Sequence, residues 1–145
     1  MLVWRAELCQ DGRTLRRLRD SLSPDELRRA NGFHFRRDCE RFVAARAALR
    51  DALSRYVGVA PRPLCFSCDN YGKPSLRDEA GRARLRFNAS HSNGLALYAV
   101  TPGRQVGVDL EFVREEFAGG SYRAALAVEG APTALRCRRR PGGVR

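Results

Sequence analysis

Residues 33–57 constrain the fold most, because they form the longest stretch of the sequence with helical periodicity. Apolar side chains recur near the 3.6-residue spacing of an α-helix, and alanines within the stretch add helix propensity. Gly58 suits a helix C-cap, and Pro61 and Pro63 block continuation. The sequence therefore predicts one long helix that ends near Gly58. Its second face carries Arg36, Arg37, Arg41, Arg46, Arg50 and Arg55.

Shorter elements are predicted on both sides of this helix. A strand is expected over residues 2–8 and a helix over residues 11–22, and a further helix begins after Ser23, which suits an N-cap. The apolar run at residues 95–100 predicts a central strand, because both of its faces are apolar. Helices followed by a largely antiparallel sheet predict an α+β fold. The other strands are predicted over residues 64–67, 84–88 and 105–112.

Residues 115–145 differ in composition from the preceding part of the chain. Residues 117–128 are predicted to be helical, despite two glycines near the start. Residues 132–145 have no apolar periodicity and end in an arginine- and glycine-rich run, which predicts a disordered or poorly packed tail. The sequence therefore divides into residues 1–114 and an atypical region, residues 115–145.

The formal net charge of +11 is large for a chain of 145 residues. Arginine supplies nearly all of the positive charge, and it binds phosphate bidentately and never becomes neutral. A polyanionic partner is therefore expected, either a nucleic acid, a phosphorylated cofactor or an acidic protein. A solvated basic surface is the competing interpretation.

The sequence shows neither a membrane span nor a signal peptide. No apolar run approaches the ~20 residues that cross a membrane, and the N-terminus lacks the basic-then-apolar layout of a signal peptide. These patterns predict a cytoplasmic protein. Five cysteines with irregular spacing argue against a disulfide framework. Cys65 and Cys68 form a lone CxxC pair without a second pair at zinc-ligand spacing, so a packing role is favoured.

Asp109 and Glu111 carry the strongest chemical signal. They lie two residues apart in an otherwise apolar strand-like run, residues 106–111. Residues i and i+2 of a strand point to the same face, so the two carboxylates would repel one another. A magnesium or manganese ion removes that repulsion, because hard cations prefer carboxylate oxygens. The alternative is a strand end whose acids face solvent or pair with arginines; with the phosphate-binding candidates upstream, metal is favoured.

Candidate phosphate-binding residues precede this pair. Ser90 and His91 follow a predicted strand, and their hydroxyl, backbone amides and imidazole suit phosphate oxygens; the alternative for His91 is a turn residue that caps backbone groups. Lys73 is the only lysine, against 26 arginines, and lies in a constrained loop between a glycine and a proline. Its alternative is an ordinary exposed turn lysine. Arg41 and Arg46 on the long helix suit a terminal phosphate, although any solvated helix face has the same pattern.

Three motifs, in this order and spacing, resemble those of the 4′-phosphopantetheinyl transferases. The most similar type is the larger, monomeric one that activates peptide and polyketide synthases. The resemblance covers roughly residues 1–114 and includes the long helix around Arg41 and Arg46. Each motif alone is weak, whereas the ordered set is specific. The motifs are Gly72-Lys73-Pro74, Phe87-Asn88-Ala89-Ser90-His91-Ser92 and Val106-Gly107-Val108-Asp109-Leu110-Glu111.

The resemblance implies a fold and a reaction. Members of the family fold as two similar α/β halves with the site between them, so this chain would contain the N-terminal half and the start of the second. A carrier-protein serine attacks the phosphorus of coenzyme A that bears the pantetheine arm, and adenosine 3′,5′-bisphosphate leaves. The resemblance also implies magnesium on Asp109 and Glu111, with manganese as a possible substitute. The residues implied to bind coenzyme A are Arg41, Arg46, Lys73, Ser90 and His91.

The sequence departs from the family in one respect. The family has a third motif, Trp-x-x-Lys-Glu, which supplies another carboxylate, a candidate base and a lysine. Nothing here matches it, because Trp4 is the only tryptophan and no lysine follows Lys73. No catalytic residue is therefore assignable, and a truncated or frameshifted chain is predicted. A basic nucleic-acid-binding protein and a non-catalytic remnant that binds coenzyme A or a carrier protein are the alternatives.

Overall fold

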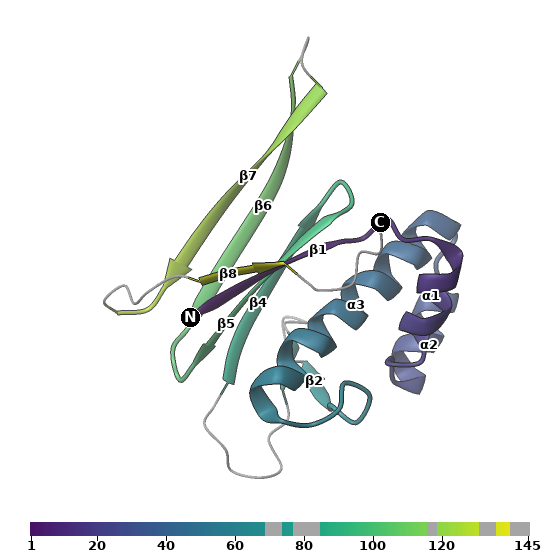
Figure 1. Cartoon of the computed structure of the whole chain (residues 1–145), viewed down its shortest axis with the longest axis horizontal. Helices are drawn as coiled ribbons and strands as arrows, with labels where there is room; N and C mark the ends of the chain where they lie inside the picture. Colours follow the sequence, from purple (N-terminus) through teal and green to yellow (C-terminus); the bar gives the residue numbers. More distant parts are fainter. Residues whose placement is uncertain (69–73, 77–84, 116–118, 131–135, 140–145) are drawn as a thin grey trace.

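The structure is a computed structural model that describes residues 1–68, 74–76, 85–115, 119–130 and 136–139. It contains helices and strands in the order expected for an α+β fold, which confirms the predicted class (Figure 1). The helices are α1 (Gly12–Arg19), α2 (Pro24–Asn31) and α3 (Arg36–Val57). The strands are β1 (Leu2–Glu7), β2 (Phe66–Cys68), β3 (Pro74–Leu76), β4 (Leu85–Ser92), β5 (Leu95–Pro102), β6 (Val106–Glu115), β7 (Gly119–Val128) and β8 (Arg136–Arg139).

Local sequence signals mark the start of α1 and α2 and the end of α3. Asp11 caps α1, and the hydrogen bonds that it accepts from the side chain and backbone of Thr14 lower the pKa of its carboxyl. Ser23 and Glu26 form a reciprocal capping box at the start of α2. Gly58 ends α3 in the left-handed conformation, with φ of 68°. The predicted long helix is therefore confirmed.

The main sheet has the strand order β4-β5-β1-β8 and separates two layers. The helices cover one face, and the β6–β7 hairpin lies against the other (Figure 1). Strand β5 is interior, as its apolar sequence predicts. Burying each large apolar side chain stabilises the fold by about 1.5–3 kcal/mol. The buried side chains on the helical face include Trp4, Ala6, Phe87, Tyr98 and Val100, and those between the sheet and the hairpin include Val3, Ala99, Val106 and Val108.

A buried ion pair joins two helices to the segment that leads into β2. The Arg50 side chain is only 1% exposed, and its Nε donates to Oε2 of Glu26 at 2.7 Å. Its Nη1 donates to three backbone carbonyl oxygens within residues 61–64, at 2.7, 3.1 and 2.9 Å. Since Glu26 lies on α2 and Arg50 on α3, this one guanidinium holds three parts of the chain together.

The C-terminal region differs from its prediction. The helix predicted for residues 117–128 is wrong, because Gly119–Val128 forms β7 and pairs antiparallel with β6 along its whole length. Each glycine weakens a helix by about 1 kcal/mol, whereas β6 offers a full row of backbone partners. Within the predicted tail, Arg136–Arg139 forms a strand parallel to β1.

Two further observations concern the central part of the chain. The strand predicted at residues 84–88 extends further, since β4 runs to Ser92, so Ser90 and His91 lie within a strand instead of after one. The turn around Lys73 lies outside the described residues. Within the described part of the chain, no helix is both long and apolar enough to cross a membrane.

Candidate functional site

Strand β6 docks beside β4 through side chains instead of a backbone ladder. Polar side chains at every second residue of β4 accept hydrogen bonds from every second backbone amide of β6. Because alternate residues of a strand share a face, these acceptors form one straight row. The hydrogen bonds run from Val108 N to Asn88 Oδ1 (2.9 Å), from Leu110 N to Ser90 Oγ (3.1 Å) and from Phe112 N to Ser92 Oγ (3.1 Å).

We expect Asn88→Ala to lower the free energy of unfolding by about 1–2 kcal/mol, because the Val108 amide loses its acceptor. Hydrogen exchange at the Val108 amide should accelerate more than exchange at Leu110, whose partner Ser90 is still present. Asn31→Ala, which removes an exposed hydrogen-bond acceptor on α2, is the matched control. Unchanged exchange at Val108 in Asn88→Ala would contradict this account of the junction.

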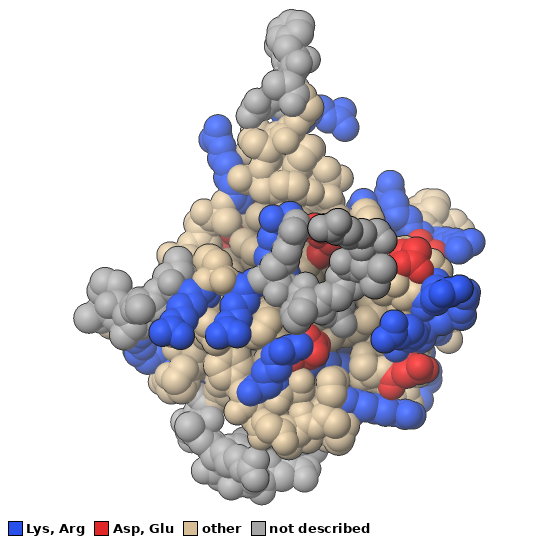
Figure 2. All heavy atoms as spheres, viewed as in Figure 1, with Lys and Arg blue, Asp and Glu red and all other residues tan. Residues whose placement is uncertain are grey.

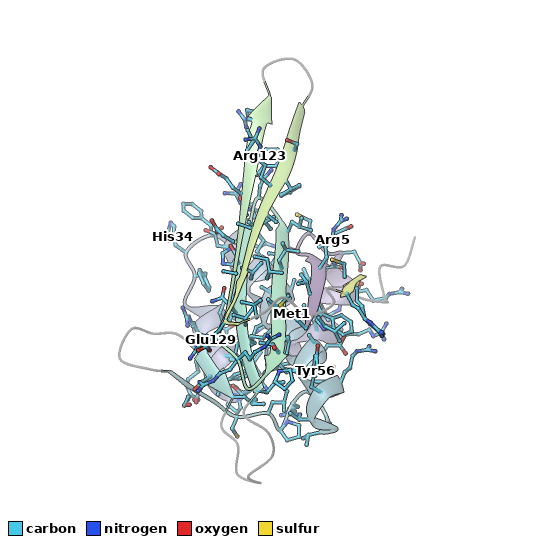
Figure 3. All side chains as sticks on the ribbon, turned by 90° about the vertical axis from the view of Figure 1, so that its left-hand side faces the viewer. Met1, Arg5, His34, Tyr56, Arg123 and Glu129 are labelled. Carbon is cyan, nitrogen blue, oxygen red and sulfur yellow. The ribbon has the colours of Figure 1, made fainter. Side chains whose placement is uncertain are left out.

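Asp109 and Glu111 lie on one face of β6, as the sequence predicts, and both are exposed. The Ser90 hydroxyl donates to Oδ1 of Asp109 at 3.2 Å, and the Leu110 amide lies 3.0 Å from the same oxygen. These contacts orient the exposed Asp109 carboxylate through Oδ1. Glu111 faces Arg123 across the hairpin in the β6–β7 register. In Figure 3, Arg123 lies in the projecting half of this hairpin and Glu129 near its other end.

The two carboxylates fit a hard cation but do not complete its coordination. Magnesium takes six oxygen ligands and usually keeps several waters or phosphate oxygens. Across the described residues, no group of three or more His, Cys, Asp or Glu side chains is placed to hold a metal ion. Asp109 and Glu111 would therefore supply two ligands, and a phosphate ester with water would supply the others.

A second group of predicted residues lies on the opposite, helical face of β4. His91 is exposed and pairs with Ala96 of β5, whose side chain belongs to the helical core. Nη2 of Arg41 lies near the β4–β5 turn, 3.7 Å from where a Cβ at Gly94 would stand. Nε of Arg41 is buried and has no hydrogen-bond partner among the described residues. An unsatisfied buried donor of this kind is costly unless a ligand accepts from it.

The β4–β5 turn lies at the end of β4, where the helical side and the hairpin side of the strand meet. Asn93 and Gly94 both have positive φ, 43° and 85°, as a two-residue hairpin turn with the twist of its strands requires. A Cβ at Gly94 would lie 3.0 Å from Sγ of Cys9, so only glycine fits without displacement. The Tyr122 hydroxyl of β7 donates to the Asn93 carbonyl at 2.7 Å. The turn therefore lies between Arg41 of α3 and the β6–β7 hairpin.

Arg46 has a different position from Arg41. Five residues of helix turn a side chain through about 140°, and Arg46 lies against Glu26, with Nε 3.2 Å from Oε1. Its guanidinium also stacks over the rings of Phe42 and Phe66. Arg46 thus contacts the helical layer, whereas Arg41 approaches the turn, and the assignment of Arg46 as a phosphate ligand stays a prediction.

The structure therefore brings the predicted residues together in two groups. Ser90, Asp109 and Glu111 lie on the hairpin side of β4, and Arg41 and His91 lie on its helical side. Because β4 is an edge strand, a ligand that crosses its end could contact both groups. Sequence reasoning did not assign roles to Asn88 and Ser92; the signal was a polar residue at every second position of β4.

Comparisons with known proteins identify the family and several relatives of this chain. Residues 10–103 match a family described as 4′-phosphopantetheinyl transferase, N-terminal; this range ends before Asp109. The 4′-phosphopantetheinyl transferase HetI of Nostoc sp. is 46% identical over 112 residues, which are 77% of this chain and 47% of HetI. A putative 4′-phosphopantetheinyl transferase of Synechocystis sp. is 34% identical over 92 residues, 63% of this chain and 37% of that protein.

A more distant relative has the same kind of name. The L-aminoadipate-semialdehyde dehydrogenase-phosphopantetheinyl transferase of Homo sapiens is 28% identical over 92 residues, 62% of this chain and 30% of that protein. The chain thus spans about half the length of HetI and less of the others. Because the matched family covers most of this chain, the chain belongs to the 4′-phosphopantetheinyl transferase family.

Proposed function

We propose that this chain supports transfer of the 4′-phosphopantetheine arm of coenzyme A to a serine of an acyl or peptidyl carrier protein. The observation that carries the proposal is the row of hydrogen bonds between β4 and β6. This row places the Ser90 hydroxyl in contact with the Asp109 carboxylate, on the same strand face as the exposed Glu111. Family membership supplies the reaction type. The activity proposed is that of the whole protein, and the matched residues make up 47% of HetI.

In this proposal, Asp109 and Glu111 hold the divalent ion that the pyrophosphate of coenzyme A also binds. The ion, magnesium or manganese, supplies positive charge that offsets the charge gained by the leaving group. Ser90 orients the Asp109 carboxylate by donating to Oδ1. The proposal assigns no general base for the attacking serine.

Arg41 and His91 bind phosphate oxygens on the other side of β4 in this proposal. The support for Arg41 is its buried, unpaired Nε, because a phosphate oxygen is a strong acceptor for a guanidinium. His91 is exposed and lies three residues before the turn that Arg41 approaches. Lys73, outside the described residues, stays a predicted contact to the nucleotide end, and the cytoplasmic location also stays a prediction.

Arg41→Ala should weaken coenzyme A binding by about tenfold, because a charge-assisted hydrogen bond to phosphate contributes roughly 1.5–3 kcal/mol. Dephospho-coenzyme A, which lacks the 3′-phosphate, should bind the parent and the variant with similar affinity. Calorimetric titration of both ligands gives the comparison, with the exposed Arg13→Ala on α1 as the control. Equal losses for both ligands would exclude a 3′-phosphate contact.

The transfer itself can be tested by mass spectrometry. An apo carrier protein incubated with the chain, coenzyme A and magnesium should gain the mass of one phosphopantetheine group. Coenzyme A binding without an adduct would indicate a non-catalytic remnant. The absence of both would contradict the proposal.

Nucleic-acid binding is the second candidate, and the net charge of +11 is the observation that favours it. Figure 2 shows arginines scattered over the visible face, with acidic side chains among them, instead of one continuous basic stripe. A DNA-binding protein would lose affinity steeply as salt rises and would not respond to coenzyme A. Titration of labelled DNA at several salt concentrations therefore separates the two candidates.

A further inference from the structure

An exposed aromatic segment precedes the first turn of α3. It consists of Phe33, His34 and Phe35, and Phe35 is 63% exposed, the most of any large apolar residue described. The Phe33 ring packs against Phe42 of α3 with centroids 5.4 Å apart, which anchors the segment. The His34 and Phe35 rings meet edge to face at 4.8 Å, and His34 lies at the periphery of the molecule (Figure 3). The segment therefore presents a fixed aromatic surface to solvent.

The fold does not require Phe35 at its position. Phe35 is the N-cap of α3 and makes no side-chain capping hydrogen bond. By contrast, Asp11 and Ser23 cap α1 and α2 with their side-chain oxygens. Helix N-caps favour Ser, Thr, Asp and Asn because these side chains satisfy free backbone amides. Capping therefore does not explain the phenylalanine at this position, and most of its side chain lies open to contact with a partner.

The charges around the aromatic segment are arranged with the cations outermost. The side chain of Arg36 is 88% exposed, whereas its ion-pair partner Glu40 is 35% exposed. Arg37 is 74% exposed and lies near Asp38, which is 42% exposed. A molecule approaching the segment therefore meets guanidinium groups before carboxylates.

The aromatic segment lies near Arg41 of the candidate site along the chain. Arg41, whose guanidinium lies beside the β4–β5 turn, follows Phe35 by less than two turns of the same helix. In the proposed function, coenzyme A lies across the end of β4 between Arg41 and Asp109, so an acceptor protein that reaches it must cover exposed residues near this turn. Of the other exposed large apolar residues, Tyr122 already donates to Asn93 and contacts the Phe112 ring, and Val59 lies beyond the opposite end of α3.

We propose that Phe33, His34 and Phe35, with Arg36 and Arg37, form the docking surface for the acceptor carrier protein. This inference rests on the proposed transfer function and names the surface that the partner contacts. The fitting surface on the partner is an apolar side chain surrounded by carboxylates, because exposed aromatic rings and outermost guanidinium groups complement that combination. Aromatic and arginine side chains are also the residues that most often dominate binding energy at protein interfaces.

Phe35→Ser is a discriminating variant, because serine is a favoured N-cap and should preserve or strengthen α3. Val59→Ser, an exposed apolar residue just beyond the other end of α3, is the matched control. The measurement is fluorescence anisotropy of a labelled apo acyl carrier protein titrated with each chain at low and moderate salt. Phe35→Ser should weaken carrier binding by about tenfold or more, and Val59→Ser should bind the carrier like the parent. Higher salt should lower the affinity of the parent for the carrier.

Coenzyme A titration of the same three proteins separates this proposal from the proposed function. Unchanged coenzyme A affinity in Phe35→Ser, together with lost carrier binding, supports a docking role for the aromatic segment. Equal carrier binding by parent and Phe35→Ser overturns the docking proposal, and so does a parent that binds coenzyme A but no carrier. Phe35→Ser could instead abolish self-association of the chain or its binding to DNA. Either result would assign the surface to a different partner and would also overturn the proposal. Failure of the parent to bind coenzyme A counts against the proposed function itself.

Discussion

Glu26→Ala should lower the free energy of unfolding by about 3–5 kcal/mol, the largest stability effect expected for one substitution in this chain. Glu26 is 8% exposed and accepts from Nε of Arg50, which is itself almost completely buried. Removing the carboxylate leaves the Arg50 charge without its counter-charge in a low-dielectric interior. The same change removes the capping hydrogen bond that Glu26 accepts from the Ser23 amide and the ion pair with Arg46.

Urea unfolding followed by circular dichroism measures this effect. Domains are stable by only about 5–15 kcal/mol, so the variant should show a strongly lowered midpoint or a substantial unfolded fraction without urea. Asp25→Ala is the control, because Asp25 occupies the preceding position of the same helix but its side chain is 83% exposed. It should change stability by about 0.5 kcal/mol or less. Similar midpoints for the two variants would show that the buried pair contributes little.

Asp109→Ala should reduce the magnesium-dependent affinity for coenzyme A by about 10- to 100-fold or more. Losses of about this size in metal affinity follow even when only a residue that hydrogen-bonds to a metal ligand is replaced. The Asp109 carboxylate is exposed, so its loss should leave the fold intact. Calorimetric titration with coenzyme A, with and without magnesium, measures the metal-dependent part of the affinity. Where transfer is detected, it should fall in parallel.

Two controls separate metal binding from structure in this experiment. Asp109→Asn keeps an oxygen that can accept from Ser90 and the Leu110 amide but loses the charge, and it should behave like Asp109→Ala. Asp20→Ala, an exposed acid after α1, should behave like the parent. Coenzyme A binding that is indifferent to magnesium and to the Asp109 variants would rule out the metal assignment.

Local signals in the sequence were sufficient to predict the helices. The caps Asp11, Ser23 and Gly58 and the spacing of apolar residues act within a few positions, so they can be interpreted without knowing the fold. Strand pairing joins segments that are distant in the sequence, so no local sequence signal predicts which strands pair. This is why β7 was mistaken for a helix and the pairing of β8 with β1 was not expected.

The sequence predicts which kinds of residue form the candidate site, but it predicts only part of how they are arranged. The alternation of Asp109 and Glu111 on one strand face follows from strand geometry alone, and the structure confirms the strand. The long helix gave no comparable guidance, because Arg41, Arg46 and Arg50 look alike as members of a basic face. Their surroundings differ completely: Arg50 is buried on Glu26, Arg46 stacks on aromatic rings, and Arg41 retains an unsatisfied donor.

The side-chain row between β4 and β6 has a consequence for how this chain tolerates changes in length. Each hydrogen bond joins residues 20 positions apart, so all three share one register between β4 and β6. Deleting one residue within β4 would exchange its two faces, which would direct the imidazole of His91 toward the hairpin and the serine hydroxyls toward the helices. Insertions and deletions in related chains are therefore expected in the turn between β5 and β6, where they alter the loop without changing which side chains face β6.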